Sequence, residues 1–299
     1  MQKTAVTIGF FDGVHTGHRH LVHQLKQLAD ERGLCPVVVS FRNHPLEVVR
    51  PGFRPMLLTS PAEKTDLLHQ AGVQRVELLD FDERMMLMSA ATFMREVLCR
   101  QFHASLLLLG YDNRIGHDAN LELDDYGAEG ETLGLEVVQA SRLSDDTLSI
   151  SSSSIRQALL QGDIMAANRL LGYAYTLTGR VTSGFHVGRT LGFPTANLMT
   201  DSQDKLIPGD GVYAVRVDVE GNDYPGVMNI GNRPTLDNGS QRSIEVHIIG
   251  FHDDIYEATI QVSFLGFLRQ QCKFPSVAAL RRQIAADRDE VVRRFPIHP

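Results

Sequence analysis

The chain has 299 residues, of which 43% are hydrophobic and 22% charged, and its formal net charge is −7. This length favours two domains, each large enough to bury its own core. The negative net charge argues against general nucleic-acid binding, which needs a basic face. Cys35, Cys99 and Cys272 are too widely spaced for a disulfide framework or a C-x-x-C metal site, so we expect a reducing, cytoplasmic environment.

No segment has the pattern of a membrane span or a secretory signal. None reaches the roughly 18 apolar residues that a membrane helix requires. The apolar run after Lys3 ends at Asp12, which is too short for a secretory signal. We therefore expect the partners to be small molecules, and neither membranes nor nucleic acids; the composition leaves the oligomeric state open.

A strand, a glycine-bearing turn and a helix open the chain. Residues 4–11 form a β-branched and aromatic run that is typical of a buried strand. Asp12-Gly13 is a turn signal. From His18 onward, apolar residues recur at three- and four-residue spacing, which predicts an amphipathic helix. The start of such a helix binds anions, because its free N–H groups and its dipole favour negative charge.

The same turn carries His15 and His18, with Gly17 between them. Two imidazoles beside an anion-binding helix start indicate stabilisation of a phosphoryl or nucleotidyl transition state, where charge and position dominate. Two other interpretations stay open at this point. The histidines can be solvated surface residues, or they can join His20 and His23 in a metal cluster, although no cysteine or carboxylate stands at ligand spacing. The absence of G-x-G-x-x-G excludes a dinucleotide fingerprint.

Strands and helices alternate through the rest of the first half. Strands are predicted over residues 36–41, 73–81, 105–109 and 134–138. One helix is predicted from Ser60, which forms a capping box with Glu63, to Gly72, and another over residues 90–102. Such alternation predicts a parallel sheet covered on both faces. Ligands of these sheets bind at the carboxyl ends of the strands.

Three further segments carry candidate ligand contacts, two of them at strand ends. Residues 41–45 (FRNHP) and 110–116 (GYDNRIG) follow predicted strands, and each can be an ordinary loop. A run of serines, residues 151–154, precedes a predicted helix over residues 155–160 and can be a cap or a linker. Alternatively, the hydroxyl of Ser152 and the guanidinium of Arg156, one turn into the helix, make a second phosphate site.

The second half has a different hydrophobic pattern. After a predicted helix over residues 163–171, runs with period two cover residues 175–182, 211–219, 224–230, 243–249 and 256–264. Clusters of Gly, Asn and Asp separate these runs, which predicts a small antiparallel barrel or sandwich. A last helix is predicted over residues 276–294. We place the domain boundary after residue 172, which gives domains of residues 1–172 and 173–299.

Residues 179–198 (GRVTSGFHVGRTLGFPTANL) form the most informative stretch of this half. Gly184, Gly188 and Gly192 allow the backbone to approach a ligand closely, and Arg189 offers a fork of donors to phosphate. A glycine-rich hairpin loop is the alternative interpretation.

Two polar pairs complete the candidate residues. Thr195 and Asn197 stand two residues apart and point the same way if the segment is extended. Their oxygens are hard donors of the kind that Mg²⁺ accepts beside substrate phosphates, although turn hydrogen bonding would also explain them. Glu245 and His247 share one face of a predicted strand whose other face is apolar. A solvated carboxylate is the alternative for Glu245.

These motifs together resemble the bacterial bifunctional riboflavin kinase/FAD synthetase family. FDGVHTGH (residues 11–18) resembles the H-x-G-H signature of nucleotidyltransferases, and ISSSSIR (residues 150–156) resembles their I-S-S-T-x-[IV]-R signature. The loops FRNHP and GYDNRIG resemble loops that hold nucleotide and flavin in that family. GRTLGFPTANL is similar to the hallmark of riboflavin kinases. The resemblance runs from residue 4 to about residue 290. This sequence departs from the family pattern at two positions. Asn113 stands where an aromatic residue or His is usual, and Ile115 stands where Phe is usual.

The resemblance implies an architecture and two reactions. The first domain would be a Rossmann-like α/β nucleotidyltransferase, and the second a small antiparallel β-barrel of the riboflavin kinase type with a C-terminal helix. The barrel would phosphorylate riboflavin with ATP and Mg²⁺, giving FMN. The first domain would then join FMN to AMP from a second ATP, giving FAD and pyrophosphate.

The resemblance also implies roles for the candidate residues. His15 and His18 would stabilise the nucleotidyl transition state. The candidates for nucleotide or flavin binding in the same domain are Gly13, Gly17, Asp112, Ser152 and Arg156. In the barrel, Glu245 would accept the proton of the riboflavin 5′-hydroxyl. Mg-ATP would be held by Thr195 and Asn197 beside the glycine-rich loop, and Arg269 belongs to a segment that resembles the family's flavin-side segment.

Two alternatives to the complete bifunctional enzyme remain at this stage. Asn113 and Ile115 motivate a working kinase joined to a weakened adenylyltransferase. A flavin-binding sensor built on a degenerate enzyme is the alternative from outside the enzyme class, and the intact H-x-G-H, P-T-A-N and Glu245 argue against it.

Overall fold

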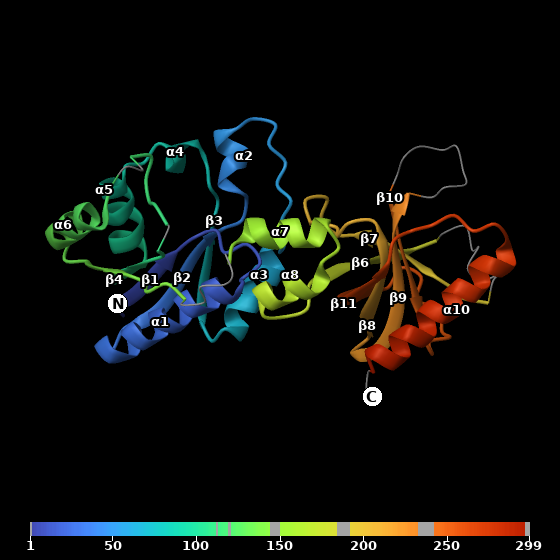
Figure 1. The fold of residues 1–299 in the computed structure, drawn as a ribbon. Helices are drawn as coiled ribbons and strands as arrows, with labels where there is room; N and C mark the ends of the chain where they lie inside the picture. The colour runs from blue at the N-terminus through green and yellow to red at the C-terminus, as the bar shows by residue number, and fades with distance from the viewer. Residues whose placement is uncertain are drawn as a thin grey trace. The chain divides into compact units, whose positions relative to one another are not determined.

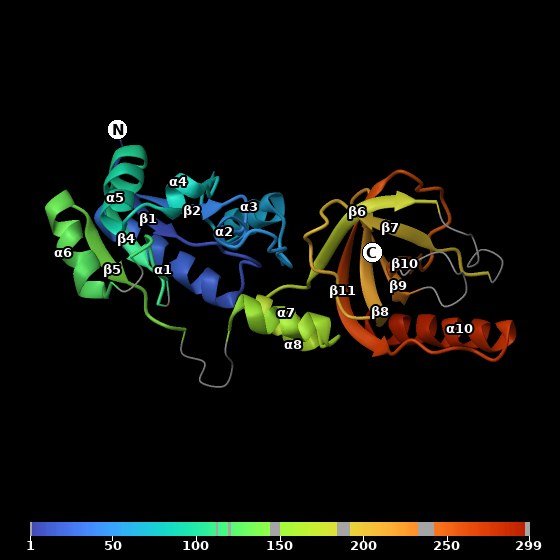
Figure 2. The same cartoon turned by 90° about the horizontal axis from the view of Figure 1, so that it is seen from above.

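The computed structural model describes residues 2–111, 113–118, 121–143, 150–183, 192–232 and 242–296. The chain divides into two compact units, Met1–Ser152 and Ser153–Pro299, whose elements are labelled in Figures 1 and 2. None of the helices in the described ranges combines the length and the apolar composition of a membrane span.

The first unit is built on a five-stranded sheet with the strand order β3-β2-β1-β4-β5. Its strands are β1 (Thr4–Ile8), β2 (Cys35–Phe41), β3 (Arg75–Leu79), β4 (Ala104–Leu109) and β5 (Glu136–Gln139). All neighbouring strands are parallel, which confirms the predicted sheet. Because β1 is the central strand, the turn that follows it lies in the middle of the ligand-binding edge.

Helices cover both faces of this sheet (Figure 1). They are α1 (Thr16–Arg32), α2 (Pro45–Val49), α3 (Pro61–Gln70), α4 (Glu83–Met86), α5 (Ala90–Phe93), η1 (Met94–Gln101) and α6 (Leu123–Leu133). Successive strand residues point to opposite faces. Val6 and Val37 therefore pack in one core with α5, η1 and α6, whereas Ala5 and Val38 pack in another with α1 and α3.

The structure refines one helical prediction and adds one helix. The helical stretch predicted over residues 90–102 is confirmed, but only α5 is α-helical and η1 continues as a π-helix. Phe102 N–H bonds to Val97 O, five residues earlier, as in a π-helix. The sequence analysis also missed α6. Its interior carries Gly127 and Gly130, and glycine lowers helix propensity by about 1 kcal/mol.

The second unit is a closed barrel with the strand order β10-β7-β6-β11-β8-β9, and all its pairs are antiparallel. Its strands are β6 (Thr176–Thr182), β7 (Ala196–Thr200), β8 (Gly211–Val219), β9 (Asn222–Asn232), β10 (Arg242–Ile248) and β11 (Thr259–Arg269). The barrel prediction is confirmed. The strand predicted over residues 256–264 begins later, because the chain first turns at Glu257, whose φ is 68°.

Three helices accompany the barrel: α7 (Ser152–Leu160), α8 (Ile164–Leu171) and α10 (Val277–Arg294). Val291 of α10 packs in a core with Val212, Ala214 and Val227 of the barrel wall. The compact units divide after Ser152, so α7 and α8 fall with the barrel, whereas we placed them in the first domain. The compact units are defined by packing and not by function. The functional boundary after residue 172 therefore stays a prediction.

Candidate active sites

The turn that follows β1 has a constrained backbone. Phe11, Gly13 and Val14 have positive φ angles of 52°, 80° and 34°. A left-handed conformation suits glycine, but it is uncommon for Phe and an outlier for a β-branched residue such as Val. Phe11 and Val14 are both buried. Strain of this kind persists only where surrounding contacts impose it, and it concentrates at functional sites.

The buried carboxylate of Asp12 supplies those contacts. It accepts hydrogen bonds from Leu58 N–H at 2.9 and 3.1 Å, from Thr59 N–H at 3.0 Å and from the Thr59 hydroxyl at 3.2 Å. The same hydroxyl accepts from Gly13 N–H at 3.0 Å. These bonds hold the turn against the segment that precedes α3. In the sequence Asp12 is recognisable only as part of a turn signal, because its partners lie about 46 residues away.

His15 and His18 form a stacked pair at the start of α1. His15 is the N-cap residue, and its Nδ1 accepts from His18 N–H at 3.3 Å. The two ring centroids are 3.6 Å apart, and the ring planes differ by 14°. Gly17 leaves room for this arrangement, because a Cβ atom there would lie 3.3 Å from two atoms of the His15 ring. The structure therefore brings together the two predicted catalytic histidines and the glycine between them.

The environment keeps His18 uncharged at neutral pH. Burial lowers the pKa of His18 well below 6.5, and the nearby His15 and Lys64 lower it further. The residue is only partly buried as a whole, but its Nδ1 is buried and has no hydrogen-bond partner among the described residues. An arriving anion would reverse this balance, because opposite charge favours the protonated imidazole.

Lys64 on α3 is a buried cation that the sequence analysis missed. Its residue exposure is 1%, and its Nζ donates to Phe41 O at 2.8 Å and to Ser40 Oγ at 3.3 Å. The Nζ also lies 4.0 Å from the ring centroid of Phe10. Burial lowers the pKa of Lys64 to about 8, and the carboxylate of Asp12 opposes this change. A lysine in an amphipathic helix normally lies on the solvated face, so the sequence carried no signal for this position.

The serine run reaches the histidine turn. Ser152 Oγ donates to Asp12 O at 2.9 Å, and Ile150 Cγ2 lies 3.6 Å from the position of a Cβ atom on Gly17. Ser152 of the second predicted anion site therefore contacts the backbone of the histidine turn. Arg156 follows one helical turn later on α7. It belongs to the second compact unit, and its contact with a phosphate stays a prediction.

The loop residues that depart from the family pattern have structural roles. The side-chain amide of Asn113 donates to Ile8 O at the end of β1. Ile115 is buried in the core, and its N–H and C=O both bond to the Tyr126 hydroxyl at 3.0 Å. These contacts support the edge of the sheet. Asp112, the predicted binding residue between them in sequence, lies outside the described residues.

His44, in the other predicted loop, caps α2. Its ring Nδ1 accepts from Leu46 N–H at 3.1 Å, and its backbone N–H donates to the Glu47 carboxylate at 3.0 Å. The ring of His44 meets the ring of Phe10 edge-on, with centroids 4.6 Å apart. Phe10 therefore connects this loop with Lys64 at the carboxyl ends of β1 and β2.

The barrel brings Glu245 between two asparagines. Glu245 on β10 lies opposite Asn197 on β7 and opposite Asn229 on β9. The alternate residues Ile244, Val246 and Ile248 are buried, and Glu245 and His247 are half-buried, as the two-residue period predicted. The predicted base and one predicted metal ligand are thus cross-strand neighbours, although nearly fifty residues of sequence separate them.

His247 supports the P-T-A-N segment. Its Nδ1 lies 2.8 Å from Pro194 O, and its ring meets the Phe193 ring edge-on with centroids 5.4 Å apart. Burial is the largest cause of a lowered pKa for His247. The sequence analysis placed His247 on the correct face but did not identify this contact, which fixes the chain one residue before Thr195.

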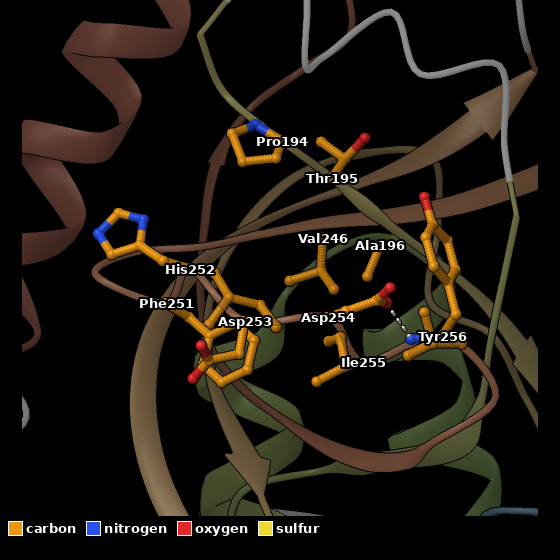
Figure 3. Close-up of a pocket in the computed structure, with 12 residues that line it drawn as sticks. Pro194, Thr195, Ala196, Val246, Phe251, His252, Asp253, Asp254, Ile255 and Tyr256 are labelled. Carbon is orange, nitrogen blue, oxygen red and sulfur yellow. Dashed lines mark hydrogen bonds between the residues drawn. The ribbon is translucent and has the colours of Figure 1, made fainter.

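A cavity of about 210 Å³ opens beside Thr195. Pro194 and Thr195 lie along one side of it and the loop of residues 251–256 along another, with the Tyr256 ring at its margin (Figure 3). Tyr256 N–H donates to the Asp254 carboxylate at 2.9 Å and so fixes the loop. No motif singled out in the sequence indicated that this loop lines a cavity.

Arg269 is engaged in a buried ion pair. Its Nε lies 3.0 and 3.1 Å from the two carboxylate oxygens of Asp287, and its Nη2 lies 2.7 Å from one of them. Gln283 donates to the same carboxylate at 2.8 Å. This pair ties the end of β11 to α10. A flavin contact by Arg269 stays a prediction.

Parts of the glycine-rich segment lie outside the described residues, namely Gly184, Gly188 and Arg189. Gly192 is described and has a φ of 83°, which favours glycine. In the described ranges, no group of three or more His, Cys, Asp or Glu side chains could hold a metal ion. The metal-cluster interpretation of the N-terminal histidines therefore has no structural support there.

Comparisons with known proteins cover both halves of the chain. The family model described as FAD synthetase matches residues 1–154, and the one described as riboflavin kinase matches residues 171–295. A bifunctional riboflavin kinase/FMN adenylyltransferase from Pseudomonas fluorescens is 37% identical over 281 residues, which cover 94% of this chain and 89% of that protein. The enzyme of the same description from Bacillus subtilis is 34% identical over 299 residues, which cover 98% and 93%.

A solved structure has the same architecture throughout. It is described as a macrolide-efflux protein from Streptococcus pneumoniae and superposes with a TM-score of 0.89 at 32% identity, covering 99% of this chain and 95% of that one.

Proposed function

Because this chain belongs to the bifunctional riboflavin kinase/FMN adenylyltransferase family, we propose that each of its two sites catalyses one of two successive ATP-dependent transfers. The chain is both a riboflavin kinase and an FMN adenylyltransferase. The barrel transfers the γ-phosphoryl group of ATP to the 5′-hydroxyl of riboflavin, giving FMN and ADP. The α/β unit transfers AMP from a second ATP to FMN, giving FAD and pyrophosphate. The observation that carries this assignment is the pairing of Glu245 with Asn197 across β10 and β7.

In the barrel, Glu245 accepts the proton that leaves the riboflavin 5′-hydroxyl as its oxygen attacks the γ-phosphorus. A carboxylate half-buried among polar neighbours suits this role, and such a base contributes about 10²–10⁴-fold to a rate. Asn197 places an amide beside Glu245, so the group that takes the proton and the group that orients phosphate act on one side of the barrel wall. His247 holds the preceding backbone at Pro194.

Mg²⁺ fits the donors that this segment offers. Thr195 and Asn197 supply a hydroxyl and an amide oxygen, and hard oxygen donors are the ligands that Mg²⁺ accepts together with substrate phosphates. When bound with ATP, the ion would neutralise charge on the transferring phosphoryl group. We assign to Thr195 and Asn197 the holding of Mg-ATP.

In the α/β unit, His15 and His18 provide N–H donors at the positive end of α1. The stack keeps both rings at the turn, and burial keeps His18 uncharged until phosphate charge arrives. Negative charge that develops between the α- and β-phosphates of ATP would then be stabilised by the imidazoles and by the helix dipole. Ser152 is bonded to the backbone of the turn and offers its hydroxyl group there.

Two further assignments belong to this proposal. The ranges matched by the two family models, residues 1–154 and 171–295, support a functional boundary near residue 172. The cysteines Cys35, Cys99 and Cys272 are free thiols, which supports a reducing, cytoplasmic location.

The test uses purified protein with riboflavin, ATP and Mg²⁺, and separates the flavins by chromatography. We expect FAD from the wild type. Glu245→Gln should lower FMN formation by about 10²–10⁴-fold but still convert added FMN to FAD, whereas His18→Ala should accumulate FMN. Loss of both reactions in either variant would overturn the assignment of two separate sites.

The same assay distinguishes the alternatives. A kinase with a weakened adenylyltransferase would stop at FMN, and a sensor would return unchanged riboflavin. Asn113 and Ile115 depart from the family pattern, but both fit the local structure. Asn113 bonds to Ile8 O at the sheet edge, and the backbone N–H and C=O of Ile115 both bond to Tyr126. These contacts favour the complete enzyme.

A further inference from the structure

The sheet register creates a row of three polar residues across the barrel wall. Asn197 on β7, Glu245 on β10 and Asn229 on β9 occupy directly opposite positions on three adjacent strands. Residues opposite each other in an antiparallel sheet share a face, and their Cβ atoms lie about 4.5–5.5 Å apart. Asn229 therefore flanks Glu245 on the side opposite to Asn197.

The Asn229 side chain forms a hydrogen bond with a residue outside this row. Gln271, in the segment after β11, donates its Nε2 to Asn229 Oδ1 at 2.8 Å. Gly231, two residues along β9, leaves room for Gln271, because a Cβ atom at that position would overlap the Gln271 amide. With its oxygen occupied as an acceptor, the Asn229 amide has N–H groups to offer.

The two asparagines then differ in what they present to the reaction. In the proposed function, the amide oxygen of Asn197 serves Mg-ATP. Asn229 has its oxygen turned to Gln271 and presents a donor instead. A carboxylate is an acceptor on both oxygens when it is ionised. A neutral N–H donor beside Glu245 fixes the direction of the carboxylate without adding a charge that would compete for it.

We propose that Asn229, held by Gln271, is a positioning residue that orients the Glu245 carboxylate for proton transfer from the flavin hydroxyl. This inference rests on the proposed role of Glu245 as the base. Misplacement of a reacting group by a fraction of an ångström lowers turnover strongly, and substrate binding is affected much less.

The decisive variant is Asn229→Asp. Aspartate has the same shape and keeps an oxygen that accepts from Gln271, but it loses the N–H donor. We expect kcat for FMN formation to fall by about 10–100-fold, with KM for ATP within about threefold of the wild type. Asn222→Asp, at the exposed start of the same strand, is the control for the added charge and should leave kcat unchanged.

Asn229→Ala and Gln271→Ala separate positioning from anchoring. Asn229→Ala should lower kcat as Asn229→Asp does. Gln271→Ala removes only the outer hydrogen bond and should have a smaller effect, about threefold, on the same constant. If Asn229 served only to anchor Gln271, Gln271→Ala and Asn229→Ala would be equally impaired and Asn229→Asp would be silent, which would overturn the proposal.

A double variant tests whether Asn229 acts through Glu245. In the Glu245→Gln background, adding Asn229→Ala should cause no further loss of the residual FMN formation, because residues that act as one unit are not additive. A further tenfold loss would refute the proposal. Conversion of FMN to FAD by the same preparation, together with an unchanged KM for ATP, shows that both units are folded.

The same set separates a failure of this inference from a failure of the proposed function. If Glu245→Gln forms FMN at the wild-type rate, Glu245 is not the base and both fail. If Glu245→Gln is strongly impaired while both Asn229 variants turn over normally, only the positioning role of Asn229 fails.

Discussion

Replacing Lys64 by methionine should change how the stability of the α/β unit depends on pH. In the folded protein, burial lowers the pKa of Lys64 from 10.5 to about 8. Below pH 8, both the folded and the unfolded chain carry the proton, and the folded state bears the full cost of the buried charge. Between pH 8 and 10.5 the unfolded chain binds the proton more tightly. The free energy of unfolding of the wild type therefore rises with pH in this window.

The size of the rise follows from the same pKa change. The lowering corresponds to about 3 kcal/mol, at ~1.4 kcal/mol for each tenfold change in proton affinity. At pH 7 the substitution has opposing effects. Methionine removes the buried charge, but Phe41 O and Ser40 Oγ lose a donor, and a buried group without its partner costs about 1–3 kcal/mol. The change in the pH dependence is therefore a cleaner measurement than the change at pH 7.

Urea denaturation followed by circular dichroism, at intervals from pH 7 to 10.5, measures this difference. The transition that Lys64→Met shifts belongs to the α/β unit, and the transition of the barrel serves as an internal reference. Lys3→Met, at an exposed lysine of the same unit, is the matched control for the loss of a lysine. We expect the wild type to gain up to about 3 kcal/mol relative to Lys64→Met between pH 8 and 10.5. A constant difference across this window would refute the reasoning.

Two other substitutions probe the packing of each site. Gly17→Ala places a Cβ atom 3.3 Å from the His15 ring and should slow conversion of FMN to FAD by about tenfold, with FMN formation unchanged; equal rates for variant and wild type in both reactions would contradict the tight fit. Asp287→Asn removes one charge of a pair in which the Asp287 and Arg269 side chains are 4% and 24% exposed. It should lower the free energy of unfolding of the barrel by about 2 kcal/mol, as measured by urea denaturation, and an unshifted barrel transition would show that the pair contributes nothing to stability.

The sequence carried enough information for the local elements and for the motifs placed on them. Strand and helix periods predicted the parallel sheet and the barrel, and β8 has the predicted bounds, Gly211–Val219. His15, Gly17 and His18 were identifiable because they lie within four residues of one another, at a helix start. Glu245 was placed on the correct face of its strand by alternation alone.

Features that depend on distant parts of the chain were not predictable in this way. Asn229 and Glu245 become neighbours only through the register of β9 and β10, which no local pattern specifies. Lys64 has a helical sequence context that is typical of solvent exposure, and its burial follows from the fit of α3 against β1 and β2. The π-helical geometry of η1 was also missed, because apolar spacing over eight residues does not distinguish it from an α-helix.

The left-handed backbone at Phe11 and Val14 has a consequence for the order of folding. Each such residue costs about 1–3 kcal/mol, and the Asp12 carboxylate offsets this cost only through bonds to Leu58 and Thr59, about 46 residues away in sequence. A chain that ends before residue 57 lacks those partners, so it lacks the conformation that stacks the histidines. We therefore expect that during synthesis this turn forms after the strand and helix that flank it, once the segment before α3 has docked.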